Sequence, residues 1–421
     1  MAGFELTGGR DRLRGTSGDD VFEGGPGTLN RDDVILGGGG NDVLIAGLAN
    51  NLSGPETPRI YFVEQLYING QGGDLSLRNV RGAEEIFADQ TSLVLEDVDS
   101  LNPAYGARGV QSGTLTINFT TEFSGDDDTL SLISEDANVT FKAGSDPQNA
   151  AIENIEIEAR GTQRDAEQVD VSAFNAVETI TVTGENRLIL DATSPEFARL
   201  DATENTGGVE LNDFNSATQD IELLGSRGDD LLLTGTGDDL IEGNDGADEI
   251  DAEAGNDTIR GGAGDDTING NAGADTIEGG EGDDDIRGGG GADAITGGEG
   301  DDRIRGGNGA DTLAGGSGDD TIRGGGGDDV IEAGSGSNLL FGGGGENTFV
   351  FADGTDEVRD FNDGLDTLVF ADGTELSTQQ DFLDLQDRDP EAFVEINSND
   401  VVLALGGAEV TVLIDTDFLQ G

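Results

Sequence analysis

The sequence contains no cysteine, histidine or tryptophan, and Lys142 is its only lysine. Without cysteine the chain forms no disulfide bond and has no thiol chemistry. Without histidine it lacks His-dependent catalytic triads and, because cysteine is also missing, the zinc sites that these two residue types build. The catalytic motifs HExxH and GxSxG do not occur, and histidine, the commonest general base, is absent. We therefore predict that the chain is not an enzyme.

Basic residues are scarce as well. The sequence contains 21 basic and 88 acidic residues, so the formal net charge is −67. Binding a phosphate backbone requires a basic face, and this composition predicts none, so nucleic acid is not an expected partner. No apolar run reaches the roughly eighteen residues of a membrane span, which predicts no membrane insertion. Residues 1–14, MAGFELTGGRDRLR, hold no apolar h-region, so we expect no cleaved N-terminal secretion signal.

Glycine, in contrast, is abundant (71 residues), and much of it belongs to a strict repeat. Residues 225–350 divide without remainder into fourteen units of nine residues, such as GGAGDDTIN at Gly261 and GGSGDDTIR at Gly315. Glycine recurs at positions one, two and four, Asp at position six, and one large aliphatic residue at position eight. A fixed period of this kind indicates a repeat array, in which each unit buries its apolar residue only by stacking on its neighbours.

Each unit is predicted to form a tight turn followed by a very short strand. Glycine reaches the positive φ values of tight turns without steric cost, which accounts for the first six positions. The last three, such as Thr267-Ile268-Asn269, form a strand whose middle side chain points inward. Two units then make one coil of eighteen residues. The sequence predicts an all-β fold, a parallel β-roll or β-helix solenoid.

Stacked coils place the position-six aspartates in two ladders. One ladder holds Asp230, Asp248, Asp266, Asp284, Asp302 and Asp320, and the other holds Asp239, Asp257, Asp275, Asp293, Asp311 and Asp329. Neighbouring carboxylates would lie about 4.8 Å apart, where unneutralised charges repel by about 1 kcal/mol per pair even in water. A cation must therefore lie between them. A cage of carboxylates and turn carbonyls suits Ca²⁺ better than Zn²⁺ or copper.

The distribution of charge is more informative than its total. An acidic excess also fits general solvation or adaptation to high salt, but neither explains an Asp at every ninth position. Arg287, Arg305 and Arg323 all occupy position nine, eighteen residues apart, so stacking would align them in a basic stripe. This stripe either balances local charge beside the Asp turns or docks an acidic patch of a neighbouring molecule.

The repeat units resemble the RTX nonapeptide G-G-x-G-x-D-x-U-x, whose parallel β-roll binds Ca²⁺ in its turns. The resemblance implies several calcium ions, each held by a position-six Asp and turn carbonyls. Twelve of the fourteen units keep this Asp, whereas Asn338 and Asn347 replace it in the last two, which fits a tapering end. RTX relatives typically leave the cell through a type I exporter that reads the C-terminal end. The resemblance thus implies an extracellular or cell-surface protein.

Residues 1–50 contain a second, smaller set of repeats. GTSGDDVFE at Gly15 and GGGGNDVLI at Gly37 fit the nonapeptide, and between them GGPGTLNRDDVIL is four residues too long. We expect an N-terminal turn stack that binds calcium through Asp20, Asp33 and Asp42. A flexible Gly/Asp loop is the weaker alternative, because the inward apolar residue keeps its place in each copy.

From residue 51 to residue 224 glycine becomes less frequent and β-branched residues alternate with polar ones, as in residues 152–157 and 177–182. Period-two alternation indicates half-buried strands. Strands at this uneven spacing fit an irregular β-helix, with a β-sandwich as the alternative. The N-v-E-x-I-x-V pattern of these segments resembles that of RTX-type bacterial surface-layer proteins, which implies a surface-layer role.

After Val350 the period breaks. Residues 356–370 resemble the D-x-I-x-D-F-x-x-G-x-D-x-I segment that closes many RTX rolls, and the strand-like stretches FVEIN, DVVLAL and EVTVLI follow. A solenoid needs such an end because an open stack exposes strand edges and apolar residues. We predict a C-terminal cap over residues 351–421, with the export signal near Phe418 and Leu419.

Three functional classes fit these features. We favour a secreted calcium-binding structural protein that self-assembles as a homo-oligomer or lattice in a surface layer or extracellular matrix, because repeats, rungs and caps occupy nearly the whole chain. The second class is a polysaccharide-modifying RTX enzyme, served by a carboxylate pair or by Tyr61, Tyr67 or Tyr105 in a cleft. The third is an RTX adhesin or toxin, although the chain lacks the apolar helix of a pore former. A cell-surface polysaccharide is a further candidate partner.

Overall fold

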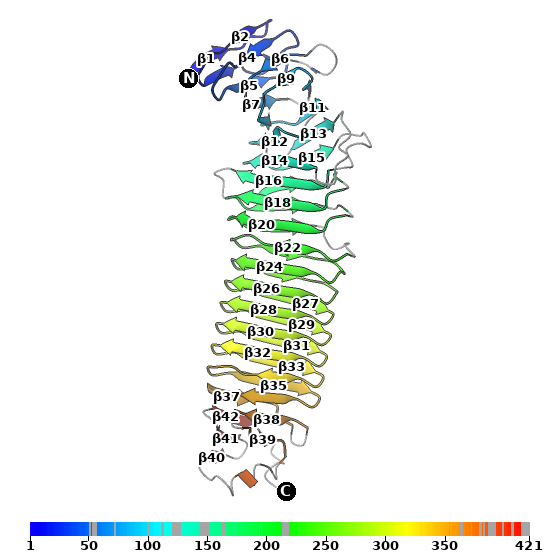
Figure 1. Ribbon diagram of the computed structural model, residues 1–421. Coiled ribbons are helices and arrows are strands. Elements are labelled where there is room, and N and C mark those ends of the chain that lie inside the picture. Colours follow the sequence, from blue (N-terminus) through cyan, green and yellow to red (C-terminus); the bar gives the residue numbers. More distant parts are fainter. Residues whose placement is uncertain are drawn as a thin grey trace. The chain divides into compact units, whose positions relative to one another are not determined.

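The computed structural model describes residues 1–421 except 50–51, 53–56, 71–72, 99–100, 111–112, 120–127, 144–151, 161–165, 173, 175, 193, 195, 213–218, 353, 363–364, 372, 379–380, 382–383, 386–392, 398–399, 406–407 and 414–421. The chain divides into two compact units, the N-terminal unit Met1–Asp213 and the C-terminal unit Phe214–Gly421. Within each unit the strands stack one above the next as successive rungs (Figure 1). No helix in the described part of the chain is long and apolar enough to cross a membrane.

The C-terminal unit is built from two parallel sheets that the chain visits alternately. The first sheet contains β22 (Glu222–Leu224), β24 (Leu240–Asp245), β26 (Thr258–Ala263), β28 (Thr276–Glu281), β30 (Ala294–Glu299), β32 (Thr312–Ser317), β34 (Val330–Glu332), β36 (Thr348–Phe351) and β38 (Thr367–Phe370). The second sheet contains β23 (Leu231–Leu233), β25 (Glu249–Asp251), β27 (Thr267–Ala272), β29 (Asp285–Gly290), β31 (Arg303–Asn308), β33 (Thr321–Gly326), β35 (Leu339–Gly344) and β37 (Gly354–Val358). Through the repeat array, paired residues are eighteen apart, as in Ile241 with Ile259. The predicted parallel β-roll is confirmed.

The position-eight side chains form the core between the two sheets. Ile241, Ile268 and Ile304 are fully buried, and every other position-eight side chain from Leu232 to Phe349 is at most 2% exposed. Burying one such aliphatic side chain stabilises a fold by roughly 1.5–3 kcal/mol. The inward column that the sequence predicts is therefore the apolar contact that holds the two sheets together.

Most strands are longer than the three residues that the sequence predicts. Strand β27 extends over the first three positions of the next unit, and the pairing of Asn271 with Gly289 shows that the ladder continues past position one. The turn therefore shrinks to positions four to six. The coils approach closely at position two: Gly262 has a φ of 125°, and a Cβ there would collide with the carbonyl oxygen of Asn244. Asn244, Glu253 and Asn271 fill the same position at smaller positive φ values of 80°, 62° and 69°.

Strands near the end of the chain cover the last coil. Strand β38 pairs antiparallel with β39 (Glu375–Leu376). The strands β40 (Phe393–Asn397), β41 (Asp400–Leu405) and β42 (Ala408–Leu413) form an antiparallel meander, and β42 pairs in parallel with β37. This pairing occupies the edge of the second sheet, which would otherwise offer a template for another chain. Phe418 and Leu419, where the export signal is predicted, lie outside the described residues.

The N-terminal unit contains three sheets. The first holds β1 (Ala2–Glu5), β3 (Asp20–Glu23), β5 (Val43–Gly47), β7 (Gln65–Asn69), β10 (Glu85–Asp89), β12 (Ala104–Arg108), β14 (Thr129–Glu135), β16 (Asn154–Arg160), β18 (Thr179–Gly184) and β20 (Arg199–Asn205). The second holds β8 (Asp74–Ser76), β11 (Leu93–Val98), β13 (Gly113–Phe119), β15 (Val139–Ala143), β17 (Glu167–Asp170), β19 (Leu188–Asp191) and β21 (Val209–Asn212). The third, which we call the arginine sheet, holds β2 (Arg12–Arg14), β4 (Val34–Leu36), β6 (Arg59–Tyr61) and β9 (Val80–Arg81).

The rungs of the N-terminal unit are uneven, as the irregular strand spacing predicts. Glu85 pairs with Ala104, nineteen residues later, whereas Tyr105 pairs with Leu132, twenty-seven residues later. Each of these pairings is parallel. The described strands therefore form a β-helix and not the antiparallel sheets of a β-sandwich, which was the alternative.

Candidate metal centres

The twelve position-six aspartates of the array lie in the turns, immediately before the strands. All twelve are buried, with 1–3% of each residue exposed. The backbone N–H of one Asp donates to the Oδ1 atom of the Asp one coil later, for example from Asp248 to Asp266 at 2.8 Å and from Asp257 to Asp275 at 2.9 Å. This pattern links Asp230, Asp248, Asp266, Asp284, Asp302 and Asp320 in one ladder, and Asp239, Asp257, Asp275, Asp293, Asp311 and Asp329 in the other.

The second carboxylate oxygen has no such partner. From Asp248 to Asp329, ten consecutive ladder members each bury an Oδ2 atom that meets no hydrogen-bond donor in the described part of the chain. Leaving a buried polar atom unpaired costs about 1–3 kcal/mol, and more if it is charged. Each of these atoms therefore requires a ligand that the protein itself does not supply.

The position-one glycines show where that ligand belongs. A Cβ built on Gly261 would meet the Oδ2 atom of Asp266 and lie 2.6 Å from the carbonyl oxygen of Gly279, one coil later. The same convergence recurs at Gly279, where the atoms belong to Asp284 and Gly297. Two oxygen atoms that both accept hydrogen bonds thus face one space, which either a proton on the carboxylate or a cation can satisfy. A carboxylate with carbonyl oxygens is the donor set of a hard cation, so these residues fit Ca²⁺.

The protonation behaviour of the ladder supports the same conclusion. Burial raises the pKa of Asp248 to about 8, and the like charges of Asp230 and Asp266 add to the rise. Burial also raises the pKa of Asp284 to about 7 and that of Asp302 to about 6. Without a cation these carboxylates are partly protonated near neutral pH. A bound Ca²⁺ would neutralise them in their charged form and tie adjacent coils together.

The N-terminal aspartates repeat the ladder with a longer coil. The N–H of Asp20 donates to Asp42 Oδ1 at 2.9 Å and that of Asp11 donates to Asp33 Oδ1 at 2.8 Å, in both cases across twenty-two residues. The three predicted ligands differ, however. The backbone N–H of Thr16 donates to Asp20 and lowers its pKa, whereas burial raises the pKa of Asp33 and Asp42.

Only one of these three carboxylates has a buried Oδ2 atom without a donor, as the aspartates of the main array do. The Oδ2 atom of Asp42 is buried without a donor among the described residues, whereas Asp33 Oδ2 accepts the N–H of Asn30 at 2.8 Å. Asp20 Oδ2 accepts the N–H and the hydroxyl of Thr16. Asp42 therefore matches the main array most closely.

Both ladders continue beyond the predicted ligands. Asn338 donates to Asp356 Oδ1 at 2.8 Å, and the N–H of Asn347 donates to Asp366 Oδ1 at 2.9 Å. At the other end of the chain, Glu64 accepts the N–H of Asp42 at 2.7 Å. Asp356 keeps the nine-residue period, eighteen residues after Asn338, but its unit FADGTDEVR lacks the glycines of positions one and two, so the nonapeptide pattern does not identify it. Asp366 and Glu64 lie out of the period, nineteen and twenty-two residues from their ladder partners. The acidic positions of the closing segment were the available signal for Asp356 and Asp366.

The candidate sites are single-carboxylate sites. Among the described residues, no group of three Asp or Glu side chains converges as a potential metal site. In the ten units with glycine at position one and Asp at position six, the carboxylate instead faces a backbone carbonyl of the following coil, and backbone carbonyls are ordinary calcium ligands. A site of this kind exists only where two coils are stacked, so binding a metal there is coupled to folding.

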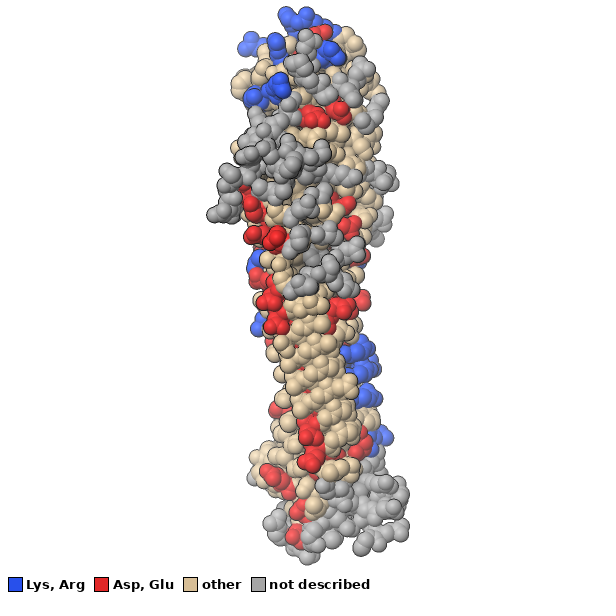
Figure 2. Space-filling model, turned by 90° about the vertical axis from the view of Figure 1, so that its right-hand side faces the viewer, with Lys and Arg blue, Asp and Glu red and all other residues tan. Residues whose placement is uncertain are grey.

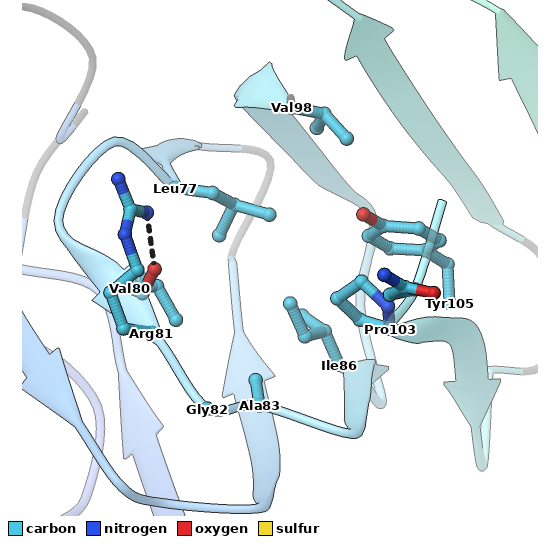
Figure 3. Close-up of a pocket in the computed structure, with 10 residues that line it drawn as sticks. Leu77, Val80, Arg81, Gly82, Ala83, Ile86, Val98, Pro103 and Tyr105 are labelled. Atoms are coloured by element: carbon cyan, nitrogen blue, oxygen red, sulfur yellow. Dashed lines mark hydrogen bonds between the residues drawn. The ribbon is translucent and has the colours of Figure 1, made fainter. Parts of the chain in front are cut away.

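The N-terminal unit also contains two hollows. A cavity of 290 Å³ is lined mainly by apolar side chains such as Leu77, Val80, Ile86 and Val98, with the ring of Tyr105 at one side (Figure 3). A polar groove of 510 Å³ is lined by Glu85, Glu156, Glu158, Arg160 and Thr181, among others. Arg160 bridges Glu85 at 2.9 Å and Glu158 at 2.7 Å.

The three tyrosines considered as catalytic candidates do not share one site. Tyr105 is 1% exposed and lines the apolar cavity. Tyr67 stacks on Phe87 with ring centroids 4.9 Å apart and lies beneath the guanidinium of Arg108. Tyr61 belongs to the arginine sheet. No common cleft brings them together in the described structure.

Comparison with known proteins gives a family match. The model described as RTX calcium-binding nonapeptide repeat (4 copies) matches residues 6–28, 29–52, 224–259, 251–286, 260–295, 287–322 and 323–358. No curated protein matches the chain. Among solved structures, an extracellular lipase, LipA from Serratia marcescens, is similar at 24% identity, with a TM-score of 0.22, over 54% of this chain and 45% of the lipase. The chain thus spans less than half of that lipase, and a likeness at this level says nothing about function.

Proposed function

The chain belongs to the proteins with RTX calcium-binding nonapeptide repeats, and from this premise we propose that it is a secreted structural protein that folds on Ca²⁺ and self-assembles in a surface layer or extracellular matrix. Its repeats account for calcium binding. The proposal of self-assembly depends on the charges that the C-terminal unit presents to solvent, because a molecule with a net charge of −67 repels its own copies unless complementary surfaces meet.

One outer face of the β-roll is basic. Arg287 pairs in register with Arg305, and Arg305 with Arg323, on the outer side of the second sheet. Arg303 lies beside them on the same face, opposite Asp285, and we call these four arginines the roll face. Figure 2 shows basic side chains gathered at one margin of the lower half of the view. The predicted stripe therefore exists and gains a fourth member.

Local charge balance explains only part of the roll face. Asp285 binds both Arg287, at 2.9 Å, and Arg305, at 2.7 Å. The guanidinium of Arg323 lies 4.5 Å from the ring centroid of Phe341. Arg303 is exposed and has no ion pair in the described part of the chain. Four positive charges thus meet a single aspartate, which leaves a surplus for a partner.

An acidic edge runs along the same coils. Exposed acids occupy the turns that lead from the first sheet to the second, among them Glu281, Asp283, Glu299 and Asp301. In these coils the returning turns carry only small or neutral residues at the equivalent positions: Gly290, Ala292, Asn308 and Ala310. We call the four acids the roll edge. The β-roll is therefore basic on one face and acidic along one of its two edges.

The roll face and the roll edge have the same spacing because both repeat once per coil, at about 4.8 Å. A face of one copy and an edge of another are thus complementary in charge and commensurate in period. Such complementarity favours specific association of charged surfaces. The two surfaces are different patches, so their contact is heterologous and leaves a free face and a free edge for further copies. An open array is the expected product.

Charge reversal tests this contact. The variant R303E/R323E reverses half of the roll face, and E281R/E299R reverses the two glutamates of the roll edge. Each variant alone should fold on calcium but form at least tenfold fewer particles by light scattering, since the altered surface then carries two positive and two negative charges and no longer attracts its partner surface. A mixture of the two should form pairs but no large particles, because only the intact roll face of one variant and the intact roll edge of the other remain complementary. If both variants assemble like the unmodified protein, the proposed contact is wrong.

We also propose that the chain has no catalytic activity. The separation of Tyr61, Tyr67 and Tyr105 supports this, because none can cooperate with another at one substrate. Turnover of a polysaccharide by the calcium-loaded protein, measured as new reducing or unsaturated ends, would contradict this proposal. For its route out of the cell we propose type I export, which a secretion assay on a chain shortened by its last eight residues tests.

A further inference from the structure

A second basic surface lies on the arginine sheet of the N-terminal unit. The register places Arg12, Val34 and Arg59 in one outward row. A parallel row contains Arg14, Leu36, Tyr61 and Arg81. The alternate residues point inward, and Ile35 and Ile60 are fully buried. Four arginines therefore surround an apolar centre on one sheet face, near the upper end of Figure 2 where basic side chains gather.

These arginines are not used for internal charge balance. Arg12, Arg14 and Arg59 are exposed, and no ion pair joins them to an acid in the described part of the chain. Arg81 donates to the neighbouring carbonyl of Val80 at 2.6 Å. Elsewhere in the N-terminal unit arginines do find acids, such as Arg108 with Asp89 at 3.1 Å. The positive charge of the arginine sheet is therefore not neutralised by acids in the described part of the chain.

The stretch of sequence that contains the arginine sheet is also much less acidic than the rest of the chain. Residues 1–81 hold 7 basic and 11 acidic residues, whereas the remaining 340 hold 14 basic and 77 acidic ones. The net charge of the whole chain predicts no basic face, and that expectation is wrong for this region because the acids are concentrated elsewhere. An anionic partner can therefore approach the arginine sheet even though the molecule as a whole is strongly acidic.

The centre of the face offers aromatic and apolar contact. Val34, Leu36 and Tyr61 are half-buried between the arginines. At the end of β6, Phe62 is 61% exposed, and its φ of 56° lies in a region that aromatic residues seldom occupy. A ring held in solvent at a backbone cost indicates that it has a contact to make.

We propose that the arginine sheet binds an acidic polysaccharide. The planar guanidinium matches a carboxylate or sulfate with two parallel hydrogen bonds, which an isolated ammonium does not. Arg14 and Arg81 lie three rungs apart, roughly 14 Å at about 4.8 Å per rung, so one linear polymer can reach both. Tyr61 and Phe62 provide rings on which the apolar face of a sugar can pack.

A lipid surface fits this face less well. Binding at a membrane interface requires apolar side chains that protrude into the headgroup region. On the arginine sheet Val34, Leu36 and Tyr61 are half-buried, and only Phe62 is largely exposed. The inference rests on secretion, as in the proposed function, but not on self-assembly, because binding requires a single folded molecule.

Binding to immobilised chondroitin sulfate, with dextran as the neutral control, tests the proposal on the full chain folded in calcium. The unmodified protein should bind the sulfated polymer and not dextran, and raising the salt should weaken binding because the contact is ionic. The variant R14E/R59E should bind at least tenfold more weakly while its circular dichroism stays unchanged. The variant R303E/R323E carries the same change in charge at the roll face and should bind like the unmodified protein.

Four results would overturn the inference. They are undiminished binding by R14E/R59E, an equal loss in R303E/R323E, equal binding to double-stranded DNA, and binding to phosphatidylglycerol vesicles without binding to the polysaccharide. The same two variants separate the two proposals. R14E/R59E should assemble normally if self-assembly depends on the roll face. Loss of polysaccharide binding and loss of particle formation are therefore separate results, and one proposal can fail while the other holds.

Discussion

At the scale of single residues, the fold concentrates its unusual chemistry in one atom per repeat. Each central ladder Asp uses Oδ1 to accept a backbone N–H and keeps a buried Oδ2 without a donor in the described structure. In most units glycine at position one leaves room beside that atom, where a carbonyl of the next coil also points. The nonapeptide thus encodes a cation site with one side chain and one missing side chain.

Replacing a ladder aspartate should remove one calcium site. The variant D284N keeps the shape of the side chain but loses the charge, so one weak site, worth about 1–2 kcal/mol at millimolar calcium, should be lost. We expect lower stability in calcium but higher stability in chelator at neutral pH, where the buried charge of Asp284 is unfavourable, measured by urea unfolding. The neighbouring variant D283N is the control, because Asp283 is exposed and its Oδ1, which accepts the N–H of Asp301, is kept.

The role of glycine at position one can be tested by adding a methyl group there. In G261A the new methyl group would occupy the space shared by Asp266 Oδ2 and the Gly279 carbonyl oxygen. Calcium binding near this coil should fail and the midpoint of thermal unfolding in calcium should fall. In G290A the nearest atom, the carbonyl oxygen of Asn271, is 3.9 Å away, so this variant should unfold like the unmodified protein. Equal effects of both substitutions would show that position one has no special role.

At the scale of strands and ladders, the carboxylates titrate as neighbours. Burial raises the pKa of Asp248 to about 8 and that of Asp284 to about 7, from the usual value of 3.8. The folded ladder therefore binds more protons than the unfolded chain between roughly pH 4 and pH 8. Its stability in the absence of calcium rises as the pH falls through this window, and is lost as the pH rises through the folded pKa values.

The expected outcome is that acid partly replaces calcium. In chelator, β-structure measured by circular dichroism should be greater at pH 5.5 than at pH 8, while in millimolar calcium the difference should be small. The general relief of charge repulsion acts in the same direction, so D248N is the informative comparison, because it removes the most strongly shifted carboxyl. The prediction is wrong if the calcium-free protein gains structure as the pH rises.

Much of the element pattern follows from the sequence, and the exceptions have physical causes. The nine-residue period predicts the inward column from Leu232 to Phe349 and both Asp ladders. It underestimates the strands, because the backbone ladder continues through glycines that have no side chain to signal a strand. In the N-terminal unit each rung has its own length, so period alone cannot give the register of Glu85 with Ala104 or of Tyr105 with Leu132.

The candidate site was predictable in its residues but not in its geometry. Sequence gives the position-six aspartates, whereas the single unpaired oxygen and the converging carbonyl depend on how two coils stack. Asp366 and Glu64 continue the ladders outside the repeat period and were therefore missed. Asp356 is in period, but its unit lacks the glycines of positions one and two that mark the nonapeptide. The arginine sheet was missed for a similar reason, because Arg14, Arg59 and Arg81 are far apart in the sequence and meet only through strand register.

At the scale of the whole molecule, one acidic chain carries two separate basic surfaces. The arginine sheet lies in the N-terminal unit and the roll face in the C-terminal unit, so attachment to a surface and contact between copies can be separated by mutation. Both proposals require the fold, and the fold of the repeat array requires neutralised ladders. Calcium is therefore the condition on which every proposed function depends.

Far-UV circular dichroism of the full chain during a calcium titration, from chelator to about 10 mM, tests this central claim most directly, because that span brackets weak extracellular sites. We predict that β-structure appears cooperatively in the millimolar range and that magnesium at the same concentration does not replace calcium. A spectrum that shows the full β-structure in chelator, or none at 10 mM calcium, would contradict the account.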